Sequence, residues 1–167
     1  MTQIGDAKRQ PSDRRRSEQE TADGTSGTES LRVAPPDLLE RFEALCAAFQ
    51  AEHGIECVCR AQPEHVRAEP GVADLLLETV GQLLANVARH AARHVEISTL
   101  ARADGSIAVN VEDDGAGIPL PLTAHDSEAH RLLAIDERLR EIGAYIEIAS
   151  VPGTCVTVIL PGRFVVP

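Results

Sequence analysis

One strand-like stretch, IAVNVEDDGAG, combines apolar residues with three carboxylates and closely spaced glycines. The two-residue period of a strand places Asp113 on the same face as Val109 and Val111. A carboxylate on an apolar face is costly unless it accepts hydrogen bonds, and a ligand amino group is one suitable donor. Gly115 and Gly117 would let that ligand approach the backbone. Alternatively, Asp113 caps its own loop amides at the end of the strand. The stretch alone leaves both interpretations open.

A second set of polar residues recurs every four positions along the segment 71–94. Glu78, Gln82, Asn86 and His90 would lie on one flank of a helix, beside an apolar stripe. An amphipathic helix needs such a polar flank for solubility. By itself, this spacing therefore favours a solvated helix surface over a binding site.

The elements that must position these residues follow an α+β order. Apolar residues recur at helical spacing in three segments, 35–54, 71–94 and 126–143. They alternate as in strands in the segments 55–61, 95–115 and 144–161. The sequence ADGS joins two of these strands in a hairpin, and VPG joins the last two. We therefore expect a two-layer α/β sandwich, a mixed and mostly antiparallel sheet with helices on one face.

Composition separates the first 33 residues from the rest of the chain. They are rich in charge, Ser, Thr and Gly and poor in large apolar residues, which predicts a disordered tail over 1–33 and one domain over 34–163. No apolar run is long enough for a signal peptide or a membrane span. A net charge of −10 argues against a nucleic-acid-binding face. We expect a cytoplasmic protein that binds neither membrane nor nucleic acid.

The four cysteines stand at positions 46, 57, 59 and 155. Cys57 and Cys59 belong to an alternating stretch, so both thiols should point to the same face. The sequence contains no CxxC pair and no histidine at a matching spacing. These features predict buried reduced thiols rather than metal ligands.

Four segments together resemble the ATP-binding domain of the GHKL superfamily, which contains sensor histidine kinases, anti-sigma-factor kinases, gyrase and Hsp90-type ATPases. QLLANVARHA resembles its N box, VEDDGAGIP its first glycine box, LAIDERLREIGAYIEIAS the segment after its second glycine box, and VPGTCVTVILP its closing strand. The resemblance covers about residues 37–161 and looks closest to the nitrate-sensor and DesK-like histidine kinases. It implies a sandwich of the Bergerat type that binds ATP and Mg²⁺.

The resemblance also implies roles for individual residues. Asn86 would complete the shell of an Mg²⁺ that bridges the nucleotide phosphates, and Asp113 would accept a hydrogen bond from the adenine amino group. Gly115 and Gly117 would let the loop approach the nucleotide. The loop after Ile118 would be a lid. The remaining contacts with the phosphates and the adenine pocket would come from Arg89, His90 and Thr154.

The chain departs from the family at the reactive end of the site. Gln82 stands where the family usually carries a glutamate that acts as a general base, and an amide cannot do so at neutral pH. The second glycine box reads EAHRLLA, with side chains at the expected glycine positions. Arg131 and His130 could offer charged substitutes for the missing phosphate contacts.

These departures predict a signalling protein with a stand-alone, partly degenerate histidine-kinase-type domain. The first histidine is His53, so no phosphoacceptor helix is expected before the domain. The domain would bind ATP and Mg²⁺ weakly, or serve as a binding module for a partner kinase, response regulator or sigma-factor regulator. Two alternatives remain. One is an active kinase acting in trans, like an anti-sigma-factor kinase, since phosphoryl transfer depends mostly on positioning. The other is a nucleotide-free interaction domain, with a possible homodimer through the sheet edge.

Overall fold

The computed structural model describes residues 37–63, 65–90, 92–118, 127–150 and 152–166. They belong to one compact unit, Val33–Pro167. The predicted disordered tail, 1–33, and the loop after Ile118 that was predicted to be a lid lie outside the described residues. Within the described ranges, no helix combines the length and apolarity that crossing a bilayer requires.

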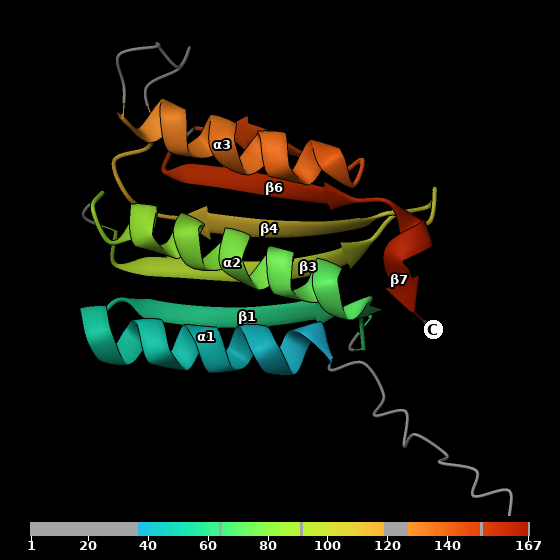
Figure 1. Ribbon diagram of the computed structural model, residues 1–167. Coiled ribbons are helices and arrows are strands. Elements are labelled where there is room, and N and C mark those ends of the chain that lie inside the picture. The colour runs from blue at the N-terminus through green and yellow to red at the C-terminus, as the bar shows by residue number, and fades with distance from the viewer. Residues whose placement is uncertain (1–36, 64, 91, 119–126, 151, 167) are drawn as a thin grey trace, which may run out of the picture. The chain divides into compact units, whose positions relative to one another are not determined.

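A five-stranded sheet forms one layer of this unit (Figure 1). Its strands, in spatial order, are β1 (Glu56–Gln62), β3 (His94–Ala101), β4 (Ile107–Asp113), β6 (Thr154–Leu160) and β5 (Tyr145–Ala149). β1 runs parallel to β3, and the other neighbours are antiparallel. The predicted mixed, mostly antiparallel sheet is confirmed, and so are the β3–β4 and β5–β6 hairpins.

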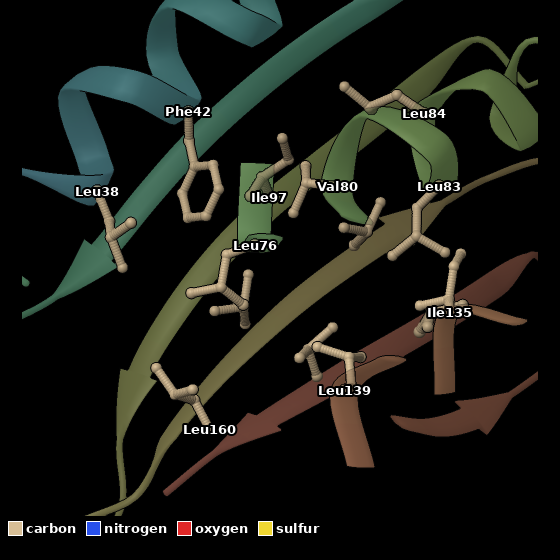
Figure 2. Packing of buried hydrophobic residues seen from close by; sticks show 14 of the residues in the cluster. Leu38, Phe42, Leu76, Val80, Leu83, Leu84, Ile97, Ile135, Leu139 and Leu160 are labelled. Atoms are coloured by element: carbon tan, nitrogen blue, oxygen red, sulfur yellow. The ribbon is translucent and has the colours of Figure 1, made fainter. Parts of the chain in front are cut away.

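Three helices form the second layer on one face of the sheet: α1 (Leu38–His53), α2 (Pro70–Val87) and α3 (Ser127–Glu141) (Figure 1). α1 ends, as expected, at Gly54, which adopts a left-handed conformation. Each helix turns apolar side chains toward the strands, as Figure 2 shows for Phe42, Leu76 and Leu139. The predicted α+β sandwich is therefore the observed architecture. In α1, Leu38 is fully buried, whereas Leu39 is half-buried.

α2 is shorter than the helix predicted over 71–94. It ends at Val87, and backbone hydrogen bonds fold the next residues, including Arg89 and His90, into tight turns. The Asp114 carboxylate accepts hydrogen bonds from the backbone N–H groups of Arg93 and His94, at 2.7 and 2.9 Å. These bonds tie the start of β3 to the end of β4, so the helix cannot continue. The predicted four-residue line of polar side chains therefore stops before His90.

A second, two-stranded sheet was not predicted. β2 (Arg67–Ala68) pairs antiparallel with β7 (Val165–Val166), which follows a short 3₁₀ helix, Gly162–Phe164. Strands of two residues are too short to show an alternating pattern, which explains why sequence periodicity missed them.

Asp37 caps the N-terminus of α1 and provides a test of the fold through pH. Its carboxylate accepts a hydrogen bond from Leu39 N at 2.9 Å and lies 2.9 Å from His65 Nδ1. Burial raises the pKa of Asp37, but hydrogen bonds from the Leu39 backbone and from His65 prevail and lower the pKa below 3.8. This contribution to stability is therefore present above the ordinary pKa and lost as the pH falls through the folded one.

Asp37→Asn should make the melting temperature less sensitive to acid. Asparagine still caps a helix, so the main change is loss of the charge. We expect a smaller fall in melting temperature between pH 6 and pH 3 than in the natural chain, measured by circular dichroism. Asp74→Asn, at an exposed carboxylate, is the matched control. Equal pH dependence in Asp37→Asn and the natural chain would contradict this role.

Candidate functional site

A small cavity lies between the C-terminal part of α2 and the adjoining ends of β4 and β6. Four of the residues singled out from the sequence line it: Asn86, His90, Asp113 and Thr154. The remaining lining side chains are apolar and include Leu83, Val111, Ile118, Leu132 and Val156. The space between the described side chains measures about 10 Å³, which is room for about one water molecule.

Asp113 is the last residue of β4 and is paired with Thr154, the first residue of β6. The two are only 7% and 5% exposed. Asp113 Oδ1 accepts a hydrogen bond from Gly115 N at 2.8 Å. The carboxylate thus caps its own loop, as the second interpretation predicted. It also lines the cavity, and its hydrogen bond to a ligand stays a prediction.

The loop after Asp113 passes close to other backbone segments. A β-carbon on Gly115 would lie 2.7 Å from the carbonyl oxygen of His90, which is too close for any side chain. Gly117 lies further along the loop, where its α-carbon faces the β5–β6 turn. At Gly115 the loop thus approaches another backbone segment, and the approach of a ligand to Gly115 and Gly117 stays a prediction.

Two residues of the β5–β6 turn hold this loop in place and were missed in the sequence. Ser150 Oγ accepts a hydrogen bond from Ile118 N at 3.0 Å and donates one to the Gly153 carbonyl at 3.2 Å. Gly153 has φ 77°, and a β-carbon there would lie 2.0 Å from the Asp113 carbonyl oxygen. The sequence VPG predicted a hairpin turn that contains Gly153, but it did not predict the contact with Asp113. Nothing in the sequence indicated a role for Ser150.

The side-chain oxygen of Asn86 has a cationic partner at the other end of the cavity. Asn86 is 6% exposed, and its Oδ1 accepts a hydrogen bond from Arg89 Nη1 at 3.0 Å. Within the described ranges, no group of three or more His, Cys, Asp or Glu residues is arranged to hold a metal ion. In this arrangement the guanidinium of Arg89 occupies one lone pair of the Asn86 oxygen and competes there with the Mg²⁺ that the resemblance implies.

Gln82 is not among the residues that line the cavity. Its Nε2 donates to Glu78 Oε1 at 3.1 Å, and Glu78 forms a two-pronged ion pair with Arg138 of α3, with Nη2 to Oε2 at 2.7 Å. The Arg138 guanidinium holds the pKa of Glu78 below its usual range. The position of the family's general base is therefore part of a surface contact between α2 and α3.

Gln82→Glu tests this placement. The new carboxylate would face Glu78 and replace a hydrogen-bond donor with an acceptor, so we expect a decrease of about 1–2 °C in melting temperature. We expect no gain in ATP hydrolysis, because the side chain at position 82 does not line the cavity. Gln62→Glu, on an exposed residue of β1, controls for the added charge. A rise in ATP hydrolysis that is specific to Gln82→Glu would contradict the placement.

Arg131 does not join the four cavity residues either. It lies in the first half of α3, and its Nε is buried without a hydrogen-bond partner in the described part of the chain. The next residue, Leu132, points into the cavity and is 1% exposed. The side chains that replace the family's glycines thus include one, on Arg131, with unsatisfied hydrogen-bonding capacity.

Comparisons with known proteins identify the family of this fold. The family model described as histidine kinase-, DNA gyrase B- and HSP90-like ATPase matches residues 71–163, more than half of the chain. No curated protein gives a significant match.

Several solved structures share the fold. The blue-light activated histidine kinase of Erythrobacter litoralis EL346 has a TM-score of 0.65 at 22% identity, over 77% of this chain and 46% of the kinase. This chain thus matches less than half the length of that kinase. The mycobacterial sensor histidine kinase MprB has a TM-score of 0.60 at 17% identity, over 76% and 95% of the two chains. The Acinetobacter baumannii histidine kinase AdeS has a TM-score of 0.60 at 14% identity, over 76% and 66%. The chain belongs to the histidine kinase-, DNA gyrase B- and HSP90-like ATPase family.

Proposed function

We propose that this chain is a signalling protein that binds ATP weakly through Asp113 and acts on a partner protein by contact rather than by phosphoryl transfer. The observation that carries the proposal is the contrast between the two ends of one cavity. At one end Asp113 and Thr154 meet on adjacent strands. At the other end Asn86 is bonded to Arg89, and Gln82 faces away toward Glu78.

The Asp113 end suits an adenine ring. The ring presents an amino donor where guanine presents a carbonyl acceptor, so a carboxylate should distinguish the two bases. Val111 and Val156 offer apolar contact for the ring from the same two strands. A hydrogen bond between a partly buried carboxylate and the amino group is strong enough to decide specificity.

The opposite end suits phosphate binding better than phosphate transfer. Phosphoryl transfer requires a positioned base or nucleophile and cations on the transferring group. Gln82 supplies no base, and the Asn86 oxygen is engaged by Arg89. The exposed guanidinium of Arg89 can itself form charge-assisted hydrogen bonds to phosphate oxygens. Nucleotide binding should therefore depend little on Mg²⁺.

The small size of the cavity supports weak binding. Sites for ligands of this size commonly have volumes of about 300–1,000 Å³, whereas the space between the described side chains is about 10 Å³. Leu132 and Ile118 must therefore move before a nucleotide can enter. If the open state is a minor one, the apparent affinity falls by its fractional population.

A domain without phosphoryl transfer must signal through its surface. A partner protein would then bind differently to the open and the closed state of the nucleotide cavity. The partner would be a histidine kinase, a response regulator or a sigma-factor regulator. This part of the proposal rests on membership of the family and on the short match to the longer sensor kinase.

Thermal unfolding with nucleotides tests the proposal. A ligand at ten times its Kd raises stability by about 1.4 kcal/mol, a shift of several degrees for a chain of this size. We expect ATP to raise the melting temperature with or without Mg²⁺, and GTP to leave it unchanged. An absence of any ATP shift would favour the nucleotide-free interaction domain. Transfer of labelled phosphate from ATP to a candidate partner would favour the kinase acting in trans.

A further inference from the structure

Three of the four cysteines meet at one corner of the fold, away from the nucleotide cavity. Cys46 lies on the sheet-facing side of α1, and Cys57 and Cys59 stand two residues apart on β1. Because β1 is the edge strand of the sheet, this corner opens to solvent. An open pocket of about 480 Å³ adjoins it, lined by the three cysteines together with Glu43, Gln50 and two alanines. Cys46 is buried, whereas Cys57 and Cys59 are half-buried rather than buried as the sequence predicted.

The sulfur atoms of Cys46 and Cys57 lie close enough together to form a disulfide bond. Cys46 Sγ and Cys57 Sγ lie 2.7 Å apart, while a disulfide bond measures about 2.05 Å. A bond between them therefore needs a movement of less than about 1 Å. The Cys59 thiol also forms a hydrogen bond with Cys46, so Cys46 is the common neighbour of the other two.

The three thiols differ in how readily they lose a proton. The hydrogen bond with Cys46 lowers the pKa of Cys57 and outweighs the effect of burial, which raises it. The same hydrogen bond raises the pKa of Cys46 to about 12. The hydrogen bond with Cys46, followed by burial, raises the pKa of Cys59. In the neutral pair the Cys57 thiol donates to the Cys46 sulfur. Once Cys57 has become the thiolate, it accepts from the Cys46 thiol instead. Cys57 lines the open pocket and is half-buried whereas Cys46 is buried, so Cys57 is the nucleophile of the pair.

We propose that Cys46 and Cys57 form a reversible disulfide when a hydroperoxide enters the open pocket. The Cys57 thiolate attacks the terminal oxygen of the hydroperoxide, the O–O bond breaks, and Cys57 becomes a sulfenic acid. The alkoxide takes up the proton that the Cys57 thiol had lost and leaves as the alcohol. The Cys46 sulfur then attacks the sulfenic sulfur and forms the S–S bond, and its proton leaves with the hydroxyl as water. Two thiols are oxidised by two electrons, and one hydroperoxide is reduced to an alcohol and water.

The bond would join α1 to the edge strand across a loop of about a dozen residues. Cross-linking such a loop restricts the unfolded chain, so the oxidised protein should melt about 5–10 °C higher than the reduced one. An external dithiol restores both thiols by thiol–disulfide exchange. This inference does not rest on nucleotide binding.

The test uses the full reduced chain treated with one equivalent of tert-butyl hydroperoxide. We expect a mass loss of about 2 Da, a fall in free thiols from four to two, and a cross-linked peptide joining Cys46 to Cys57. Dithiothreitol should reverse all three changes. Cys155→Ser, on a thiol whose neighbour is Thr157 rather than a cysteine, is the matched control and should oxidise like the natural chain.

Peptide mapping of the natural chain decides the outcome even if the Cys46→Ala variant, described next, does not fold. Cys46→Ala should abolish the mass loss of about 2 Da, and circular dichroism checks that this variant is folded. A gain of about 32 Da at Cys57, which signals irreversible sulfinic acid, would overturn the proposal. A cross-link between Cys57 and Cys59, or no oxidation at one equivalent, would also overturn it.

Discussion

Asp113→Asn should weaken ATP binding by about tenfold to a hundredfold, because a charge-assisted hydrogen bond to a buried carboxylate is worth about 1.5–3 kcal/mol. The fold should survive, since the asparagine Oδ1 can still accept the hydrogen bond from Gly115 N that Asp113 accepts at 2.8 Å. We expect the melting temperature without nucleotide to change little. A titration of both proteins with ATP measures the difference in affinity.

The neighbouring residue supplies the control for this prediction. Glu112 is exposed and belongs to the same strand, but it faces the opposite side of the sheet. Glu112→Gln removes the same charge and should leave ATP affinity unchanged. If Asp113→Asn binds ATP as tightly as the natural chain does, the adenine end of the cavity is not where we place it.

Gly153→Ala should lower the free energy of unfolding by more than about 3 kcal/mol, through backbone strain and steric overlap together. Gly153 has φ 77°, and an added β-carbon would lie 2.0 Å from the Asp113 carbonyl oxygen. A clash with backbone cannot be relieved by a side-chain rotation. The β5–β6 turn would have to move away from Asp113, so ATP binding should weaken as well.

Gly105→Ala separates the effect of backbone strain from that of steric overlap. Gly105 has φ 82°, but a β-carbon there would meet no atom within 4 Å. The substitution at Gly105 should therefore lower the free energy of unfolding by about 1 kcal/mol, through backbone strain alone. Urea denaturation of the two variants gives both values. Equal losses of unfolding free energy in the two variants would show that the alanine at position 153 does not overlap with Asp113.

Sequence periodicity predicted those features of the molecule that depend on local pattern. Strand alternation placed Asp113 on the face that lines the cavity, and the turn signals placed both hairpins correctly. Helical spacing identified the buried stripe of α2. These predictions succeeded because the apolar face of a helix or strand must turn toward the core wherever the element lies.

Sequence periodicity could not predict the tertiary partners of polar side chains. Gln82 and Glu78 are neighbours at helical spacing, but the ion-pair partner of Glu78, Arg138, comes from α3. Arg89 bonds to Asn86 from the turn that follows the early end of α2. Both facts depend on tertiary contacts, including the hold of Asp114 on the start of β3. The 2.7 Å approach of Cys46 to Cys57 likewise depends on how α1 packs against β1.

Isothermal titration calorimetry of the natural chain with ATP tests the central claim most directly. The central claim is that the Asp113 end still binds adenine while the Asn86 end has lost its dependence on Mg²⁺. We predict saturable binding at one site, with nearly the same affinity in Mg²⁺ and in a chelator, and no saturable heat with GTP. No heat with ATP at millimolar concentration, or binding that disappears in the chelator, would contradict the account.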